Sequence, residues 1–425
     1  MESPETSRRR FLKTSTAVGA GIAAAPNLLL GQAKGANERF RVGVIGLSRG
    51  RGHIKGYQDV PNAEVAYICD VDENRLASTA KQMADKNQGT PEAVGDFRRI
   101  LDDPDIDAVS IATPNFWHTP AAITACKAGK HVYVEKPGSY DAHEAMTLVK
   151  VAKETNRQVQ MGAQRRSYPA MIEAVQKLRE GVIGELRYAR CWYSSTRPSI
   201  GKGKIGEPPA ELDWTMWQGP VPDAPYKSNL LHYNWHFHWL YGGGELDNGV
   251  HALDVARWAM DVAYPNRATC MGGRYHYNDD QETPDTTTAV YDYGDVGISW
   301  EASSCHRRKP EKQSFVTVYG DGGKLDFTSS NYAIYDIDGK EIAKNTDPPS
   351  DIPHFTNFAN SVREGEELNL PISEGQISAM LCHLGNMAYR TTGAVNVDSE
   401  TGELIDNPEA QKLWGRPEYR AGWEV

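Results

Sequence analysis

The apolar positions between residues 40 and 163 follow two periods in turn. Short β-rich runs lie at 41–45, 63–69, 108–112, 131–134 and 158–161. Helical spacing fills the intervals between them, at 53–60, 74–86, 120–128 and 141–156. Strands that alternate with helices in this way predict a doubly wound parallel sheet of the Rossmann type. Such sheets bind ligands beyond the carboxyl ends of their strands.

The pattern changes after residue 163 and predicts a second α/β domain. A loop rich in Gly and Pro spans 196–244, and strand-like runs then follow one another between 269 and 335. Sequential strands joined by short turns favour a large, mainly antiparallel open sheet. Helices are expected at 168–180, 246–260, 351–364 and 375–390. We therefore expect a Rossmann domain over 34–163, a second domain over 164–394, and a tail over 395–425 that wraps a neighbouring subunit.

The first strand runs into a glycine-rich turn, Gly46-Leu-Ser48-Arg49-Gly50. Glycine lets a backbone approach a pyrophosphate, and the N-terminus of the following helix offers free N–H groups. Asp70 follows 24 residues after Gly46, where a carboxylate can bind both ribose hydroxyls. That carboxylate would repel a 2′-phosphate, so the pattern favours NAD over NADP. Ser48 stands where the common fingerprint has its second glycine, and a turn-forming role is the alternative for Asp70.

Polar residues also follow the next two strands. They are Thr113, Pro114, Asn115 and His118 after one strand, and Glu135 and Lys136 after the other. All six are candidates for contact with the cofactor. Beside a cationic nicotinamide the Lys136 ammonium is disfavoured, which lowers its pKa towards that of a useful base. The alternative is that Lys136 only forms a salt bridge with Glu135.

The helix expected at 246–260 carries a second pair of candidates. Asp247 and His251 are four residues apart and therefore share one face of that helix. An Asp can orient an imidazole and fix its tautomer, so these two residues and Lys136 form the predicted catalytic set. The alternative is that Asp247 caps the helix and that His251 is a core histidine.

Taken in chain order, these motifs resemble the glucose-fructose oxidoreductase / inositol dehydrogenase / rhizopine catabolism (Gfo/Idh/MocA) family. The likeness rests on the glycine turn, Asp70, Ala-Thr-Pro-Asn at 112–115, Glu-Lys-Pro at 135–137, and the stretch 245–254. The resemblance implies an NAD-binding domain and a second domain that binds substrate and whose open sheet makes homodimer or homotetramer contacts. It also implies that the substrate lies beside Lys136, Asp247 and His251.

Four further residues are candidates for contact with the substrate: Arg165, Arg166, His236 and His238. Together with His232, the two histidines could instead form a metal site, because His-x-His is a ligand spacing. No carboxylate or cysteine is placed convincingly with them, so we expect no metal. Binding of a polyol by polar and aromatic loop side chains is the preferred interpretation.

The first residues are predicted to be an export signal. Ser-Arg-Arg-Arg-Phe-Leu-Lys at 7–13 matches the twin-arginine pattern, and an apolar run over 14–30 follows it. Gly19 and Pro26 interrupt that run, which makes it a poor membrane span. We expect residues 1–33 to be a twin-arginine signal peptide and the protein to be periplasmic or otherwise exported. A chance basic start before a small-residue linker is the alternative.

Charge and cysteine content narrow the possible partners. The 425 residues carry a net charge of −10, which argues against binding to nucleic acid or to an anionic membrane surface. The six cysteines lie far apart, so neither a zinc site nor a disulfide framework is expected.

The sequence therefore predicts an enzyme that transfers hydride between a sugar or sugar derivative and a tightly bound NAD. The hydroxyl proton would pass to His251 or Lys136. An NAD-dependent glycosidase, which oxidises a sugar hydroxyl transiently and loses the glycosidic bond by elimination, is the alternative. A non-catalytic binding module is a third possibility. The expected partners are a sugar or polyol substrate, the twin-arginine export machinery and further copies of this chain.

Overall fold

The first sheet holds six strands in the order β3-β2-β1-β4-β5-β6, all paired in parallel. They are β1 (Phe40–Ile45), β2 (Ala63–Cys69), β3 (Glu92–Val94), β4 (Ala108–Ile111), β5 (His131–Glu135) and β6 (Val159–Gly162). The computed structural model describes residues 39–306, 311–391 and 393–425. The predicted signal peptide, residues 1–33, lies outside these ranges.

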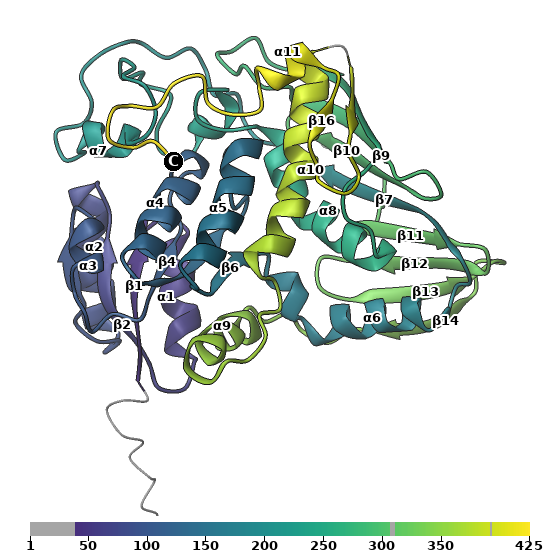
Figure 1. Ribbon diagram of the computed structural model, residues 1–425, viewed down its shortest axis with the longest axis horizontal. Coiled ribbons are helices and arrows are strands. Elements are labelled where there is room, and N and C mark those ends of the chain that lie inside the picture. Colours follow the sequence, from purple (N-terminus) through teal and green to yellow (C-terminus); the bar gives the residue numbers. More distant parts are fainter. Residues whose placement is uncertain (1–38, 307–310, 392) are drawn as a thin grey trace, which may run out of the picture. The chain divides into compact units, whose positions relative to one another are not determined.

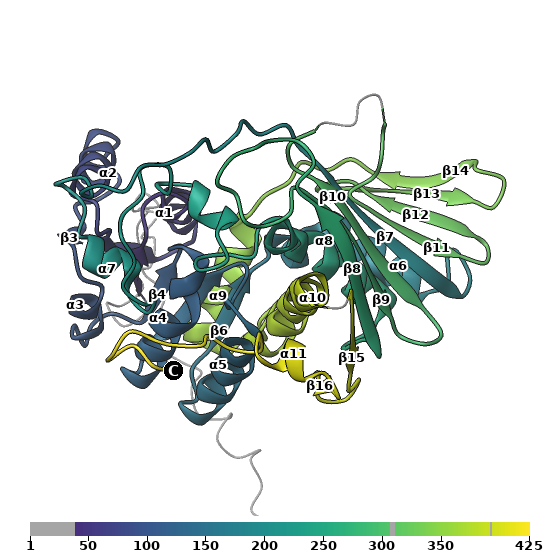
Figure 2. The same cartoon turned by 90° about the horizontal axis from the view of Figure 1, so that it is seen from above.

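Helices cover both faces of this sheet, as the alternating pattern predicted. α1 (Gly50–Gln58) and α2 (Glu73–Asp85) lie on one side, and α4 (Asn115–Lys127) and α5 (Ala142–Glu154) lie on the other (Figure 2). All four residues of β4 are buried because both of its faces are covered. In the register, Ile45 is level with Cys69 and with Ile111, so the three chains leave the sheet at one edge.

The second sheet holds ten strands in the order β14-β13-β12-β11-β7-β10-β9-β8-β15-β16. Within the described residues its named pairings are antiparallel except that of β7 with β10. The strands are β7 (Leu186–Ser194), β8 (Arg267–Gly273), β9 (Thr286–Asp292), β10 (Gly297–Ser303), β11 (Val316–Gly320), β12 (Gly323–Phe327), β13 (Tyr332–Asp336), β14 (Glu341–Asn345), β15 (Ala394–Val397) and β16 (Leu404–Ile405). The predicted fold class is confirmed.

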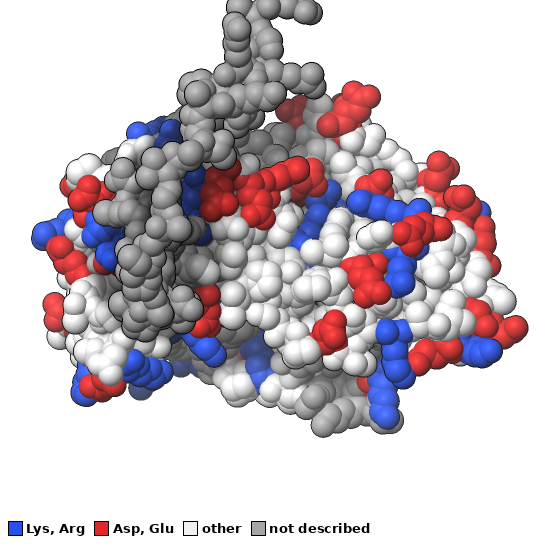
Figure 3. All heavy atoms as spheres, turned by 90° about the horizontal axis from the view of Figure 1, so that it is seen from below, with Lys and Arg blue, Asp and Glu red and all other residues white. Residues whose placement is uncertain are grey.

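Two long helices lie between the sheets. α8 (Glu245–Met260) packs on β7 and β10, and α10 (Ile372–Arg390) packs on α8 and β8 and, on its other side, on α5 (Figures 1 and 2). Alternate residues of β9 are buried, which shows that one face of the sheet is covered and the other is not. No described helix has the length and apolarity that crossing a membrane requires. On the face drawn in Figure 3, acidic and basic side chains are interspersed around uncharged surface.

One expectation about an individual element was wrong. The helix expected at 120–128 begins at Asn115, directly after the strand, because Pro114 is extended and Pro120 is accommodated inside the helix. Two strands, β15 and β16, stand where the tail was expected to begin. The tail packs on its own chain, where Trp423 contacts Trp117, and its expected contact with a neighbouring subunit stays a prediction.

A buried ion pair joins the end of the first sheet to α8. Arg166 follows β6 in a short helix, η2 (Gln164–Ser167), and both its Nε and its Nη2 donate to Asp254 at 2.9 Å. The Ser378 hydroxyl on α10 donates to the same carboxylate at 2.7 Å. The Arg166 and Asp254 side chains are only 8% and 1% exposed, so each charge depends on the other for compensation.

We expect Asp254→Asn to lower the free energy of unfolding by about 3–5 kcal/mol, because it leaves the Arg166 guanidinium buried without a counter-charge. Urea denaturation measures this loss. Asp321→Asn is the control, since it breaks an exposed pair with Arg187 that water screens, and it should change the free energy of unfolding far less than Asp254→Asn does. Equal losses in the two variants would contradict the assignment.

Candidate functional site

The turn after β1 fits a nucleotide pyrophosphate. Gly46 has φ +88°, and a Cβ atom there would lie 2.7 Å from the Ala112 carbonyl oxygen, so only glycine is accommodated. Gly50 is enclosed as well, since a Cβ would meet the Val44 side chain at 2.9 Å and push α1 off β1. No side chain caps the N-terminus of α1, which leaves that end of the helix open to an anion. Ser48, in the turn, is exposed.

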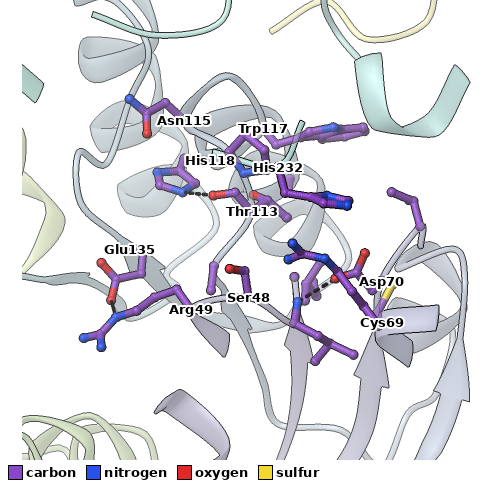
Figure 4. A pocket seen from close by; sticks show the side chains of 18 of the residues that line it. Ser48, Arg49, Cys69, Asp70, Thr113, Asn115, Trp117, His118, Glu135 and His232 are labelled. Atoms are coloured by element: carbon purple, nitrogen blue, oxygen red, sulfur yellow. Dashed lines mark hydrogen bonds and ion pairs between the residues drawn. The ribbon is translucent and has the colours of Figure 1, made fainter. Parts of the chain in front are cut away.

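Asp70 is held beside this turn at the end of β2. Its Oδ2 accepts a hydrogen bond from the Leu47 amide at 2.7 Å, and its Oδ1 accepts one from the Asp72 amide at 3.0 Å (Figure 4). Burial raises the pKa of Asp70, although the two amides act in the opposite direction. Each oxygen keeps a lone pair, which suits a carboxylate that binds two ribose hydroxyls.

A cavity of about 530 Å³ extends along the carboxyl ends of the strands of the first sheet. Thirteen of the predicted site residues line it: Gly46, Ser48, Arg49, Asp70, Thr113, Pro114, Asn115, His118, Glu135, Lys136, Arg165, His236 and His251. Four do not: Gly50, Arg166, His238 and Asp247. Gly50 lies outside the cavity because it packs under the turn. Arg166 lies outside the cavity because its guanidinium binds Asp254.

Asp247 connects the two domains at one end of this cavity. Its Oδ2 accepts hydrogen bonds from the Asn115 side chain at 2.5 Å and from the Gly243 amide at 2.6 Å. The His251 Nδ1 atom is buried and has no hydrogen-bond partner among the described residues. Asp247 therefore does not hold the His251 imidazole as expected, and its hydrogen bonds come from Asn115 and Gly243 instead. Burial raises the pKa of Asp247 to about 6.

Lys136 lies beside these groups at the end of β5. Burial lowers its pKa, while the charges of Glu135 and Asp247 act to raise it. Burial, helped by the charge of Lys136, also lowers the pKa of His251 far below its ordinary value. At neutral pH the cavity end therefore presents an uncharged imidazole next to an amine that releases its proton more readily than usual.

Glu135 is occupied by partners other than the Lys136 amine. Its Oε1 is 3.0 Å from both Arg49 Nε and His53 Nε2, and its Oε2 accepts from the Lys136 amide at 3.1 Å. Burial favours a higher pKa for Glu135, but His53, Arg49 and Lys136 outweigh it and hold that pKa well below its ordinary value. In the described part of the chain the Lys136 side chain forms no ion pair, so the salt-bridge alternative is wrong. His53 is a site residue that the sequence gave no reason to select.

The three histidines of the long loop do not converge. His232 faces Asp72 at 3.4 Å, His236 stacks on Trp235, and His238 Nδ1 lies 3.2 Å from Glu282. No group of three potential metal ligands is found among the described residues. Only His232 and His236 line the cavity.

The His118 ring is buried and bonds to two backbone carbonyls of its own domain. Its two ring nitrogens lie 2.5 Å from the Pro137 carbonyl and 2.9 Å from the Thr113 carbonyl (Figure 4). The ring thereby holds together the turns that follow β4 and β5.

A segment of the long loop, residues 211–217, crosses the cavity beside Asp70; we call it the strap. Its backbone bonds to that of the Asp70 turn, from Asp213 N to Val71 O and from Glu73 N to Glu211 O, both at 3.0 Å. Three strap residues line the cavity: Leu212, Met216 and Trp217. Apolar residues inside a Gly- and Pro-rich loop were the signal that could have revealed it.

The C-terminal tail holds the strap in place. Arg420 donates to the Thr215 carbonyl at 2.8 Å and to Gln218 at 3.1 Å. Trp423 packs edge-on against Trp117, a cavity-lining residue, with ring centroids 4.7 Å apart. The tail itself is anchored by a buried ion pair of 2.7 Å between Arg416 and Glu144 on α5.

Fold and site together define a two-domain dinucleotide-binding protein. A family described as an oxidoreductase family with an NAD-binding Rossmann fold matches residues 40–163, and its C-terminal alpha/beta domain matches residues 199–425. The chain belongs to this NAD-binding oxidoreductase family, Gfo/Idh/MocA. The glycine turn, the Asp70 carboxylate and the buried Thr113 hydroxyl, which has no partner among the described residues, fit NAD.

Relatives and solved structures agree with this assignment. A glycosyl hydrolase family 109 protein of Saccharopolyspora erythraea is 34% identical over 172 residues, 36% of this chain and 38% of the relative. Another, from Parabacteroides distasonis, is 27% identical over 299 residues, 64% of this chain and 63% of the relative. The chain thus spans less than two thirds of the length of these curated relatives.

Two solved structures share the fold at 18% identity. One is an aldose-aldose oxidoreductase from Caulobacter crescentus complexed with glycerol, with a TM-score of 0.66 over 84% of this chain and 100% of that one. The other is the WlbA dehydrogenase from Bordetella pertussis in complex with NADH and UDP-GlcNAcA, with a TM-score of 0.64 over 85% and 99%.

We expect Trp423→Ala to release bound NAD about two- to tenfold faster, because it removes an aromatic contact that supports Trp117 at the strap. Dialysis of the purified protein followed by measurement of retained nucleotide checks this. Tyr275→Ala is the matched control, since Tyr275 is 72% exposed and does not line the cavity. Equal release from the two variants would show that the tail does not retain the cofactor.

Proposed function

We propose that the protein transfers hydride between bound NAD and the hydroxyl-bearing carbon of a sugar or sugar derivative. One observation carries the proposal: Lys136, free of any ion pair in the described part of the chain, lines the cavity together with His251 and beside Asp247. The first domain supplies the amine, and α8 of the second domain supplies the imidazole and the carboxylate.

Each residue has a definite task in this chemistry. NAD, held by the glycine turn and Asp70, would supply the hydride chemistry. Lys136 accepts the hydroxyl proton as the carbon is oxidised, which its lowered pKa allows. Asp247, fixed by Asn115 and Gly243, stabilises the ammonium that forms. The uncharged His251 offers a hydrogen bond to the substrate oxygen.

A glycosidase is the second candidate, and the family 109 relatives favour it. Oxidation of a sugar hydroxyl acidifies the adjacent C–H bond, the glycosidic bond is lost by elimination, and the hydride then returns to the sugar. NAD is unchanged over such a cycle. A strap that retains the cofactor suits a reaction that never exchanges it.

The same retention supports our proposal on location. A protein that keeps its nucleotide in place can be exported already folded, as the twin-arginine pattern at 7–13 predicts. We therefore propose a periplasmic or otherwise exported enzyme that acts on a sugar or polyol. We also propose that copies of the chain associate as a homodimer or homotetramer.

We expect Lys136→Met to slow reduction of the bound nicotinamide by about a hundredfold or more, because the neighbouring His251 imidazole, whose pKa burial lowers far below its ordinary value, is a much weaker proton acceptor. NAD content should stay unchanged, since Gly46 and Asp70 are untouched. Lys127→Met, at an exposed site in the last turn of α4, is the control. Absorbance of reduced nicotinamide with a panel of sugars measures the rate. A near-normal rate in Lys136→Met would remove Lys136 from the mechanism.

Release of free sugar from aryl glycosides, without added NAD, separates the two candidates. Release that Lys136→Met abolishes supports the glycosidase. Reduction of bound NAD by free sugars with no such release supports the dehydrogenase.

The pH dependence of sugar oxidation should follow Lys136. Burial lowers the pKa of that amine, the charges of Glu135 and Asp247 raise it, and the charge of Arg49 lowers it further. The rate should therefore rise with pH along a limb whose midpoint lies below the ordinary lysine value of 10.5. Asp247→Asn removes a negative charge, so the limb should move to lower pH.

A matched variant controls for the mutation itself. Burial raises the pKa of the Cys382 thiol well above its ordinary value, so this group is neutral across the limb. Cys382→Ala should therefore leave the midpoint in place. If Asp247→Asn also leaves it in place, the limb does not report Lys136.

A further inference from the structure

Two adjacent arginines after β6 have opposite electrostatic surroundings. Arg166 is neutralised by the two oxygens of Asp254 and does not line the cavity. Arg165 lines the cavity and, in the part of the chain that the structure describes, forms no ion pair. Its Nε donates to the Ser329 carbonyl at 2.8 Å, and its guanidinium lies 4.6 Å from the centre of the Phe315 ring. The side chain is thus held by uncharged groups.

The order of the sheet places Arg165 on the substrate side of the cavity. β6, which precedes Arg165, is three strands from β1 and its glycine turn, or about 14 Å at the usual strand spacing. β5, which ends before Lys136, lies between them. The backbone of Arg165 therefore leaves the sheet on the far side of β5 from the glycine turn. The positive charge of Arg165 also contributes to lowering the pKa of His251.

The carboxylates near this end of the cavity already have partners. Glu135 binds Arg49 and His53. Asp351 accepts a hydrogen bond from the Tyr168 hydroxyl at 2.5 Å and lies 3.6 Å from Arg49. Among the described residues none of these carboxylates forms an ion pair with the partly buried Arg165. Asp351 and Asp254 favour its charge only from a distance, and burial outweighs them and lowers its pKa. A partly desolvated cation without a counter-ion gains strongly from an anionic ligand.

We infer that Arg165 binds an oxyanion carried by the substrate, so the substrate is an acidic sugar such as a uronate, a sugar phosphate or a sugar sulfate. This inference rests on the proposed function. A planar guanidinium matches a carboxylate or phosphate through two parallel hydrogen bonds. The anion fixes which sugar carbon faces Lys136 and His251, so Arg165 determines specificity.

Binding to the NAD-loaded protein tests the inference directly. The probes are D-glucose, D-glucuronate, D-glucose 6-phosphate and D-glucose 6-sulfate, titrated against the fluorescence of the cavity tryptophans. At least one acidic probe should bind about ten- to a hundredfold more tightly than glucose, as expected for a charged hydrogen bond. The acid that binds best identifies the oxyanion. Glucose binding as tightly as all three acids would overturn the inference.

Variants of Arg165 assign the preference to this residue. Arg165→Met should remove the preference for the acid while leaving the affinity for glucose unchanged, and Arg165→Lys should keep part of it. Arg187→Met, which removes an exposed positive charge on β7, should leave it intact. Loss of the preference in Arg187→Met, or its survival in Arg165→Met, would overturn the inference.

Reduction of the bound nicotinamide distinguishes this inference from the proposed function. If neutral sugars reduce it and acidic sugars do not, the hydride-transfer proposal stands and the role of Arg165 fails. If acidic sugars bind through Arg165 but no probe is oxidised or cleaved, the anion site stands and the proposed reaction fails.

Discussion

The hydrogen bond between Asn115 and Asp247 is the contact on which the site depends. It joins the carboxyl end of β4 to α8 of the second domain. A buried carboxylate is costly unless it is hydrogen-bonded, so the bonds from Asn115 and Gly243 are what allow Asp247 to lie there. With that carboxylate in place, the Lys136 amine faces a negative charge from the other domain. Neither domain alone forms this end of the cavity.

Pairing of charges elsewhere decides which cations remain available to ligands. Glu135 directly precedes Lys136 in the chain but binds Arg49. Asp254 binds Arg166 rather than its neighbour Arg165. Lys136 and Arg165 are consequently left without carboxylate partners in the described part of the chain. One of these cations suits proton transfer because burial lowers its pKa, and the other suits recognition because guanidinium stays charged.

The sequence could predict those parts of the molecule that depend on neighbours along the chain. The alternation of short apolar runs with helical spacing follows from the periods of strand and helix, and it gave the parallel sheet correctly. Gly46 and Asp70 could be found because a glycine turn after one strand and an acid after the next carry a chemical meaning in themselves. The domain boundaries and the signal peptide stay predictions.

Only the tertiary structure decided which side chains, far apart in the sequence, bind one another. Adjacent residues Arg165 and Arg166 look alike in the sequence, but packing gives Asp254 to one and the cavity to the other. Asp247 and His251 share a helix face, yet Asp247 bonds to Asn115, 132 residues away. The strap and the tail meet at the cavity only after folding. Local spacing determines faces and turns, whereas the partners of a buried charge are set by whatever segment packing brings to it.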